Sequence, residues 1–298
     1  MTTIKGVLAK FLLWLTALLP LAVNRALGSL LGRVNYRLNT QMRKVTEENL
    51  RLCFPDLDDS ARRELACRSL IETGKTLTEA GAIWHRRYDW LQRRVLSVTG
   101  ARFLRDAIAL QRGVIVLVPH LGNWEVVGLH LSEYTAVTSL YQPPKLPLLE
   151  AVIRRGRQQC GATLVPTNRS GVSAVLKVLR RGGVTAILPD QVPDRSSGGE
   201  FAEFFGVPAL TMTLVNNLLG RIGCRVLMAY AKRVPGGFDI VFQPAHEDIY
   251  SSDDCIALTG LNRSVEQCVR EIPSQYQWEY KRFKKRPPNE PRLYRFKN

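Results

Sequence analysis

The hydrophobic residues of this chain follow three successive patterns. Residues 6–32 are almost continuously apolar, residues 61–84 carry apolar positions at helical spacing, and from residue 113 short apolar runs alternate with helical stretches. Strands that alternate with helices build parallel sheets, so the third pattern predicts an α/β sandwich with a largely parallel central sheet flanked by helices. There is no internal repeat and no long flexible linker, so residues 33–298 are predicted to form a single domain.

The predicted strands of this domain are short and rich in β-branched residues. They are Val114–Val118, Ala136–Tyr141, Thr163–Val165, Val184–Leu188, Arg225–Ala231 and Phe238–Phe242. The predicted helices lie near 102–111, 123–132, 146–159, 171–181, 209–222 and 254–271. In folds of this type ligands bind where parallel strands end, so functional side chains are expected in the loops that follow these strands.

The amino-terminal segment, residues 1–32, is predicted to be a hydrophobic membrane anchor. Between Lys10 and Arg25 lie fourteen uncharged residues, Phe11 to Asn24, fewer than the about 20 that a standard membrane span needs. The segment is compatible with a short or tilted span in which Lys10 and Arg25 snorkel, with a helix on the membrane surface, or with a helix packed on the protein's own core. If it spans the membrane, the basic residues that follow it place the rest of the chain in the cytoplasm.

The charge of the chain favours an anionic partner. Lys and Arg number 42 against 26 Asp and Glu, a formal net charge of +16. Nucleic acid is not the expected partner, because the basic residues are spread over the chain and no nucleic-acid-binding motif is present. A basic surface beside a hydrophobic anchor fits an anionic membrane better. The six cysteines form no CxxC pair, which indicates free thiols in a reducing compartment and predicts no metal site.

The clearest candidate for chemistry is the turn after the strand predicted at Val114–Val118. His120 follows that strand, Gly122 permits a tight turn, and Glu125 follows in the next helix, separated from His120 by four residues. On such a turn a carboxylate can orient an imidazole, which then acts as a general base toward an alcohol. The spacing alone is also compatible with a histidine that is only structural.

The residues of this turn resemble those of a known family. The segment PHLGNWE (119–125) resembles the His-x4-Asp/Glu signature of the lysophospholipid acyltransferase superfamily. Within that superfamily it is most similar to the bacterial late acyltransferases of lipid A biosynthesis, the lauroyl- and myristoyltransferase type. Further segments resemble blocks of the same family in the same order and cover nearly the whole chain: TEENLRLCFPDLDDSARRELACRSL (46–70), LLEAVIRRGRQQCGATLVP (148–166), ILPDQVPDRSSGGEFAEFFGVPALTMT (187–213) and IPSQYQWEYKRFKKRPPNEPRLY (272–294).

The resemblance implies an enzyme that moves a fatty acyl chain from acyl carrier protein to a hydroxyl of a lipid A precursor. His120 would deprotonate the hydroxyl, and Glu125 would orient and polarise His120. Arg157 would steady the substrate or the developing negative charge, while Asp190 and Gln191 would bind substrate at the end of a strand. No metal or other cofactor is implied. The implied partners are acyl carrier protein, an anionic lipid A precursor and the membrane, at the cytoplasmic face of the bacterial inner membrane.

Three alternatives stay open. The same chemistry could act on a lysophospholipid, an aminolipid or a glycolipid. The chain could instead be a membrane lipid-binding protein without activity, although His120 and Glu125 together argue against this. It could also be a metal-dependent hydrolase that uses His120, Glu125 and Asp190. In the last of the family-like segments, the closing block (272–294), Arg282 and Lys284 are candidates for contact with a phosphate.

Overall fold

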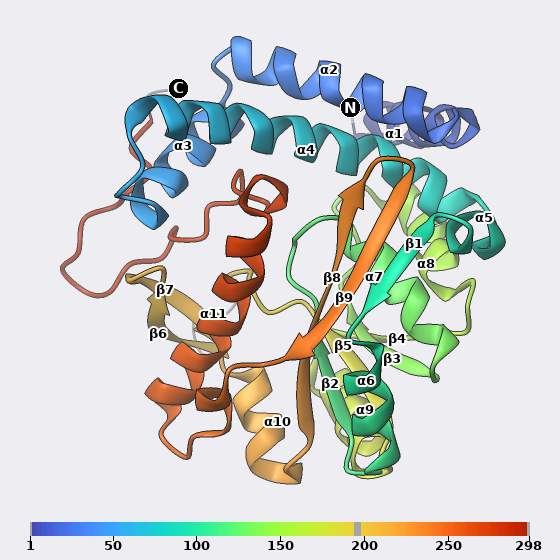
Figure 1. Ribbon diagram of the computed structural model, residues 1–298, viewed down its shortest axis with the longest axis vertical. Coiled ribbons are helices and arrows are strands. Elements are labelled where there is room, and N and C mark those ends of the chain that lie inside the picture. The colour runs from blue at the N-terminus through green and yellow to red at the C-terminus, as the bar shows by residue number, and fades with distance from the viewer. Residues whose placement is uncertain (1, 194–197, 297–298) are drawn as a thin grey trace.

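The computed structural model describes residues 2–193 and 198–296, and a seven-stranded sheet forms its centre (Figure 1). The order of the strands is β1-β9-β8-β2-β5-β3-β4. Their bounds are Val95–Thr99 (β1), Val114–Leu117 (β2), Val137–Tyr141 (β3), Thr163–Pro166 (β4), Val184–Ile187 (β5), Arg225–Val234 (β8) and Gly237–Pro244 (β9). All neighbouring strands are parallel except β8 and β9, which are antiparallel. The predicted α/β fold with a largely parallel sheet is therefore confirmed.

Helices cover both faces of the sheet because its central strands bury side chains on both sides. In β2, Ile115 and Leu117 belong to one hydrophobic cluster, while Val114 and Val116 belong to the other. The first face is covered by α9 (Arg169–Arg180), α10 (Leu214–Ile222) and α11 (Asp254–Glu271). The second face is covered by α6 (Ala101–Ala109) and α7 (Trp124–His130).

A long helix, α4 (Asp59–His85), crosses above the sheet (Figure 1). It contains the helical pattern of residues 61–84, and the side chain of Asp58 caps its first turn by accepting a hydrogen bond from the backbone N–H of Ala61 at 2.8 Å. The helix packs against α7, α8 (Glu150–Gln158) and the short 3-10 turn Pro273–Gln275. It therefore lies over the loops in which functional side chains are expected. Helix α3 (Gln41–Cys53) packs against α4, and α5 (Tyr88–Gln92) follows α4 in the chain. Short 3-10 turns elsewhere in the fold cover Leu131–Glu133, Pro147–Leu149 and Glu247–Tyr250.

The amino-terminal segment forms two helices rather than one. Helix α1 (Thr2–Leu18) ends just before Pro20, and α2 (Leu21–Arg37) follows it, since proline cannot continue the hydrogen bonding of a helix. Within the described residues, the structure contains no helix with the length and apolarity that a membrane span requires. The predicted membrane-spanning helix is thus not supported.

Arg25 also differs from the prediction that it snorkels toward the membrane surface. Its guanidinium turns into the protein, where it forms an ion pair with Glu79 at 2.7 Å. It also donates to the carbonyl oxygens of Val234 and Gly237. The apolar run therefore has an inner face that is tied to the domain.

Glycines bring α2 close to α4. A Cβ on Gly28 would lie 2.6 Å from the Cα of Lys75, and a Cβ on Gly32 would lie 2.3 Å from the carbonyl oxygen of Leu70. Gly74 of α4 faces Gly28 in the same way. Both distances are shorter than any van der Waals contact, so the two helices can cross this closely only where side chains are absent.

A small hairpin was not predicted. Strands β6 (Gly199–Phe204) and β7 (Val207–Met212) pair around the two-residue turn Phe205–Gly206, in which both residues have positive φ. The helix predicted over 209–222 is wrong in its first part, because β7 extends to Met212 and α10 begins at Leu214. A short apolar run fits a helix or a strand equally well. Strand β1 was also missed. Residues 194–197 of the family-like segment 187–213 lie outside the described residues.

We expect Gly32→Ala to lower the free energy of unfolding by about 1–3 kcal/mol, because the new methyl group has no room at the α2–α4 crossing. Gly220→Ala is the matched control. It lies in α10 with nothing within 4 Å of its Cβ position, so it should be neutral or stabilise by up to about 1 kcal/mol. Urea unfolding followed by circular dichroism measures both. Equal stability of the two variants would contradict the close crossing.

Candidate functional site

Two side chains of the site come from adjacent parallel strands. Leu117 of β2 lies beside Ile187 of β5, and three residues later each strand is followed by a polar residue, His120 and Asp190 respectively. A proline precedes each of them and ends its strand, since proline has no N–H for the next ladder bond. His120 and Asp190 therefore meet at the carboxyl edge of the sheet.

Asp190 holds His120 in two ways. Its Oδ1 lies 2.8 Å from the His120 Nδ1, and its Oδ2 accepts the backbone N–H of His120 at 2.9 Å. Burial raises the pKa of the Asp190 carboxyl, but His120 outweighs this effect through charge and hydrogen bonds, so the pKa is lowered overall. An ionised carboxylate can only accept hydrogen bonds. Nδ1 of His120 therefore carries the proton and donates a hydrogen bond to Asp190.

The other nitrogen of His120 is left as an acceptor. The amide Nε2 of Gln191 lies 3.1 Å from the His120 Nε2 and donates to it. The structure thus brings together three of the sequence-predicted site residues, His120, Asp190 and Gln191. An imidazole with one nitrogen bonded to a buried carboxylate and the other available as an acceptor is the arrangement that general-base catalysis requires.

Glu125 has other partners. The Nη2 and Nε of Arg157 donate to its two carboxylate oxygens at 2.5 and 2.9 Å, and the indole N–H of Trp84 donates to it at 3.1 Å. Burial raises the pKa of Glu125, but the charge and hydrogen bonds of Arg157 outweigh it, so the pKa is lowered overall. Contrary to the pairing expected from the sequence, these hydrogen bonds hold Glu125 on Arg157, and the carboxylate bonded to His120 is Asp190.

Two cavities meet at Glu125 and Trp124. The larger measures about 310 Å³ and reaches His120. Its wall combines apolar side chains with polar ones. Besides His120 and Glu125, the polar ones are Thr73, Thr76, Asn123, Gln275, Tyr276, Gln277 and Glu279. The smaller measures about 70 Å³ and reaches Arg157. Its wall is mainly apolar, formed by Val118, Leu129, Leu140, Leu164, Ala186 and Leu188 among others. The site therefore places a polar compartment beside an apolar one.

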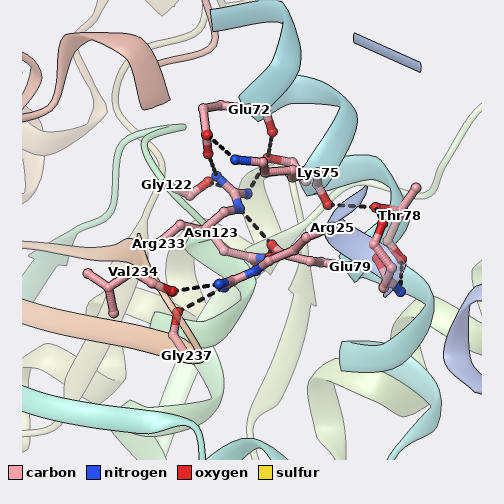
Figure 2. Close-up of polar contacts among 12 residues, drawn as sticks. Arg25, Glu72, Lys75, Thr78, Glu79, Gly122, Asn123, Arg233, Val234 and Gly237 are labelled. Atoms are coloured by element: carbon pink, nitrogen blue, oxygen red, sulfur yellow. Dashed lines mark hydrogen bonds and ion pairs between the residues drawn. The ribbon is translucent and has the colours of Figure 1, made fainter. Parts of the chain in front are cut away.

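A buried ionic network fixes the turn after His120 (Figure 2). Glu79 of α4 accepts from Arg233 of β8 at 2.7 Å, from the side-chain amide of Asn123 at 2.8 Å, and from Arg25 at 2.7 Å. Arg233 also donates to the carbonyl oxygen of Gly122 at 3.1 Å. The side chains of Glu79 and Arg233 are 1% and 3% exposed. The turn is thus hydrogen-bonded to Glu79 of α4 and to Arg233 of the sheet.

The backbone of the turn is equally constrained. Gly122 has φ +60°, and a Cβ there would lie 2.0 Å from the carbonyl oxygen of Ala231, which confirms the prediction that the turn needs glycine. The backbone N–H of Gly122 donates to the carbonyl oxygen of Gln275, and the N–H of Gln277 donates to that of His120. The closing block of the chain therefore pairs directly with the candidate active-site turn.

Several residues of the site were not found from the sequence. Glu79, Arg233 and Trp84 stand in no motif. Glu279 was quoted only inside the closing block; it lines the larger cavity and accepts from Thr73 at 3.0 Å, and burial raises its pKa.

The expectation for Arg282 is wrong. It is 2% exposed and its guanidinium donates to the carbonyl oxygen of Leu210 and the hydroxyl of Thr211, so it is not placed to meet a phosphate. Lys284 is exposed, with its ammonium 5.2 Å from the centre of the Tyr280 ring.

We expect the protein to lose stability as the pH falls below about 4.5. Asp190 and Glu125 both have pKa values below their ordinary values in the folded state. Their stabilising interactions are therefore present above the ordinary pKa and are lost as the pH falls. The pKa of Glu279 is raised, so this residue has the opposite effect and lowers the stability of the protein as the pH rises. Urea unfolding between pH 6 and pH 3 measures the slope.

Glu125→Gln should reduce that slope and lower the stability at pH 6 by about 2 kcal/mol, because it leaves Arg157 without its partner. The matched control is Glu64→Gln, which removes an exposed carboxylate 3.7 Å from Arg68. An exposed pair contributes little, so this variant should keep the slope of the wild type. The assignment would be contradicted by the same slope in all three proteins.

Comparison with known proteins identifies the family. The model of the bacterial lipid A biosynthesis acyltransferase family matches residues 2–285. The lipid A biosynthesis lauroyltransferase of Escherichia coli K12 is 28% identical over 289 residues, which are 95% of this chain and 92% of that protein. The palmitoleoyltransferase of the same strain is 28% identical over 288 residues, with the same two shares. Its myristoyltransferase is 26% identical over 277 residues, 90% of this chain and 83% of that protein. The chain therefore belongs to the bacterial lipid A biosynthesis acyltransferase family.

Proposed function

We propose that this protein transfers a fatty acyl chain from the thioester of acyl carrier protein to a hydroxyl of a lipid A precursor, with His120 as the general base. One observation carries the proposal. His120 lines the larger cavity, and its Nδ1 is bonded to the buried carboxylate of Asp190. Membership of the acyltransferase family and similarity to lipid A acyltransferases over nearly the whole chain support the reaction class and the acceptor.

In the proposed reaction the acceptor hydroxyl gives its proton to the Nε2 of His120 as its oxygen attacks the thioester carbonyl carbon. Asp190 stabilises the imidazolium that forms. When the tetrahedral intermediate collapses, the carbon–sulfur bond breaks and the imidazolium returns the proton to the departing thiolate. The products are an ester and the free thiol of the carrier. The amide of Gln191, which now bonds Nε2, exchanges this contact for the substrate hydroxyl.

Glu125 and Arg157 are proposed to act on the other side of the reacting carbonyl. A guanidinium stays charged, and its donors stabilise the oxyanion that develops on that carbonyl. Glu125 holds Arg157 by a bidentate pair and stands between the two cavities. The apolar smaller cavity is the place where the first carbons of the acyl chain would lie. The role of Glu125 in catalysis is thus proposed to pass through Arg157.

The net charge of +16 supports both partners. A basic protein surface attracts an acidic carrier protein and an anionic lipid, and raises the rate of encounter with each of them.

Helices α1 and α2 are proposed to lie on the cytoplasmic surface of the bacterial inner membrane. Their outer faces expose an unusual number of large apolar side chains. On α1 these are Ile4, Val7, Leu8, Phe11, Leu12, Trp14, Leu15 and Leu18, and on α2 they are Val23, Leu27, Leu30, Leu31 and Val34. A helix that binds a bilayer surface places such a face among the lipid headgroups and the first acyl carbons.

Mass spectrometry of lipid A from cells with and without this protein tests the function. We expect the deletion to remove one acyl mass, which the wild type restores. His120→Ala should fail to restore it, and Asp190→Asn should lower the transfer rate about 10²–10⁴-fold, because the imidazolium loses its carboxylate.

The matched control is Gln111→Ala. Gln111 is an exposed residue after α6, and its variant should restore the acyl mass. Unchanged lipid A on deletion, with a mass shift in another lipid class, would move the acceptor. Full activity of Asp190→Asn together with loss of activity in Glu125→Gln would return the role of base partner to Glu125.

The membrane contact is tested by Phe11→Asp combined with Leu15→Asp. We expect this variant to bind phospholipid vesicles at least about tenfold more weakly, because two charges replace apolar side chains at the bilayer surface. Leu110→Asp combined with Ile256→Asp changes two equally exposed apolar residues elsewhere, which are 49% and 48% exposed. Vesicle flotation should show this control at the wild-type level. A similar loss in both variants would refute the assignment of the lipid-facing surface to α1.

A further inference from the structure

A basic cavity lies beside the end of α1. It measures about 530 Å³, and it is lined by Arg87, Asp89, Trp90, Arg93, Arg94 and Gly236. Arg86 connects it to the apolar helices, because its guanidinium donates to the carbonyl oxygens of Ala17 at 2.6 Å and Leu19 at 3.1 Å. The cavity therefore adjoins the surface that α1 is proposed to place on the bilayer.

Two guanidinium groups, those of Arg94 in the cavity wall and of the neighbouring Arg86, lie over the indole ring of Trp90. The Cζ of Arg94 is 4.1 Å from the centre of the Trp90 ring, and that of Arg86 is 4.9 Å from it. Arg94 also donates to the carbonyl oxygen of Trp90 at 2.7 Å. Stacking on an aromatic ring holds the guanidinium plane in place and leaves its edge for a further partner.

The positive charge of the cavity is only partly neutralised by the protein. Within residues 2–193 and 198–296, neither Arg93 nor Arg94 forms an ion pair with a carboxylate. Asp89 is the acidic residue of the cavity wall, and it lies 3.6 Å from Arg87 with 59% of its side chain exposed. Burial and the neighbouring charges of Arg86 and Arg93 lower the pKa of Arg94. Like charges crowded in this way are relieved when an anion binds.

We propose that this cavity binds the phosphate group of an anionic phospholipid while α1 and α2 lie on the bilayer. The inference rests on the proposed membrane contact of these helices. Guanidinium groups match the geometry of phosphate oxygens. A helix on the bilayer surface lies at the level of the phospholipid headgroups, and anionic headgroups attract basic side chains beside it. Tryptophan is likewise enriched at that level. Apolar burial along α1 and phosphate binding at Trp90 would together fix how the protein sits on the membrane.

The experiment compares vesicles of phosphatidylcholine with vesicles that also contain phosphatidylglycerol. Arg93→Gln combined with Arg94→Gln should weaken binding to the phosphatidylglycerol vesicles about thirtyfold and leave binding to pure phosphatidylcholine unchanged. The matched control is Arg180→Gln combined with Arg181→Gln, which removes the same charge at the end of α9, far from α1 and α2 (Figure 1). We expect this control to lose much less. Because Arg94 also packs on Trp90, the single variant Arg93→Gln is measured as well.

Four outcomes would overturn the proposal. Equal losses in the two double variants would show an effect of net charge alone. Competition by inorganic phosphate at low concentration would indicate a site for a soluble anion. Acyl transfer in detergent micelles should be unchanged in Arg93→Gln with Arg94→Gln, and a loss there would assign the site to the acceptor lipid. If the wild type binds neither kind of vesicle, the proposed membrane contact itself fails, whereas an inactive protein that still prefers phosphatidylglycerol separates this site from the proposed reaction.

Discussion

The buried ion pair between Glu79 and Arg233 connects α2, α4 and β8 to the turn that follows His120. Removing two charges from water is costly, and the cost is offset only when each remaining donor and acceptor is satisfied. Glu79 meets this condition by accepting from Arg25, Arg233 and Asn123. Arg25 belongs to α2, Arg233 to β8 and Asn123 to the turn after His120. The carboxylate of Glu79 in α4 therefore joins the amino-terminal helices, the sheet and the candidate active site.

The same constraint explains the inward direction of Arg25. A guanidinium at the edge of an apolar run is expected to reach for water, as the sequence analysis assumed. A buried carboxylate 2.7 Å away and two backbone carbonyl groups give it better partners than water. Apolar patterning could show that the first residues form helices, but not that one charge in them completes a network with Glu79, 54 positions later.

The site was predictable where its chemistry is local and not where it is tertiary. His120 and Gly122 could be identified because a strand, a proline and a tight turn follow one another in the sequence. Asp190 could be placed at the end of a second strand, also after a proline. That it faces His120 depends on β2 pairing with β5, and strands that are not neighbours in the sequence carry no signal of their pairing. The short spacing favoured Glu125, and spacing cannot show that Arg157 and Trp84 hold its side chain.

The two carboxylates of the site differ in their partners, and this difference supports the separate roles proposed for them. Glu125 is neutralised by the bidentate contact with Arg157, so its charge has little left to offer a proton on His120. Asp190 contacts no guanidinium among its hydrogen bonds in the described chain, and bonds instead to the ring and the backbone N–H of His120. Its charge is therefore available to an imidazolium at the moment one forms. A site that needs one nitrogen to gain and release a proton, and a cation beside a developing oxyanion, requires two carboxylates with separate partners. Both carboxylates are present here: Glu125 lies at the start of α7, just after the turn that follows β2, and Asp190 lies after the end of the neighbouring strand β5.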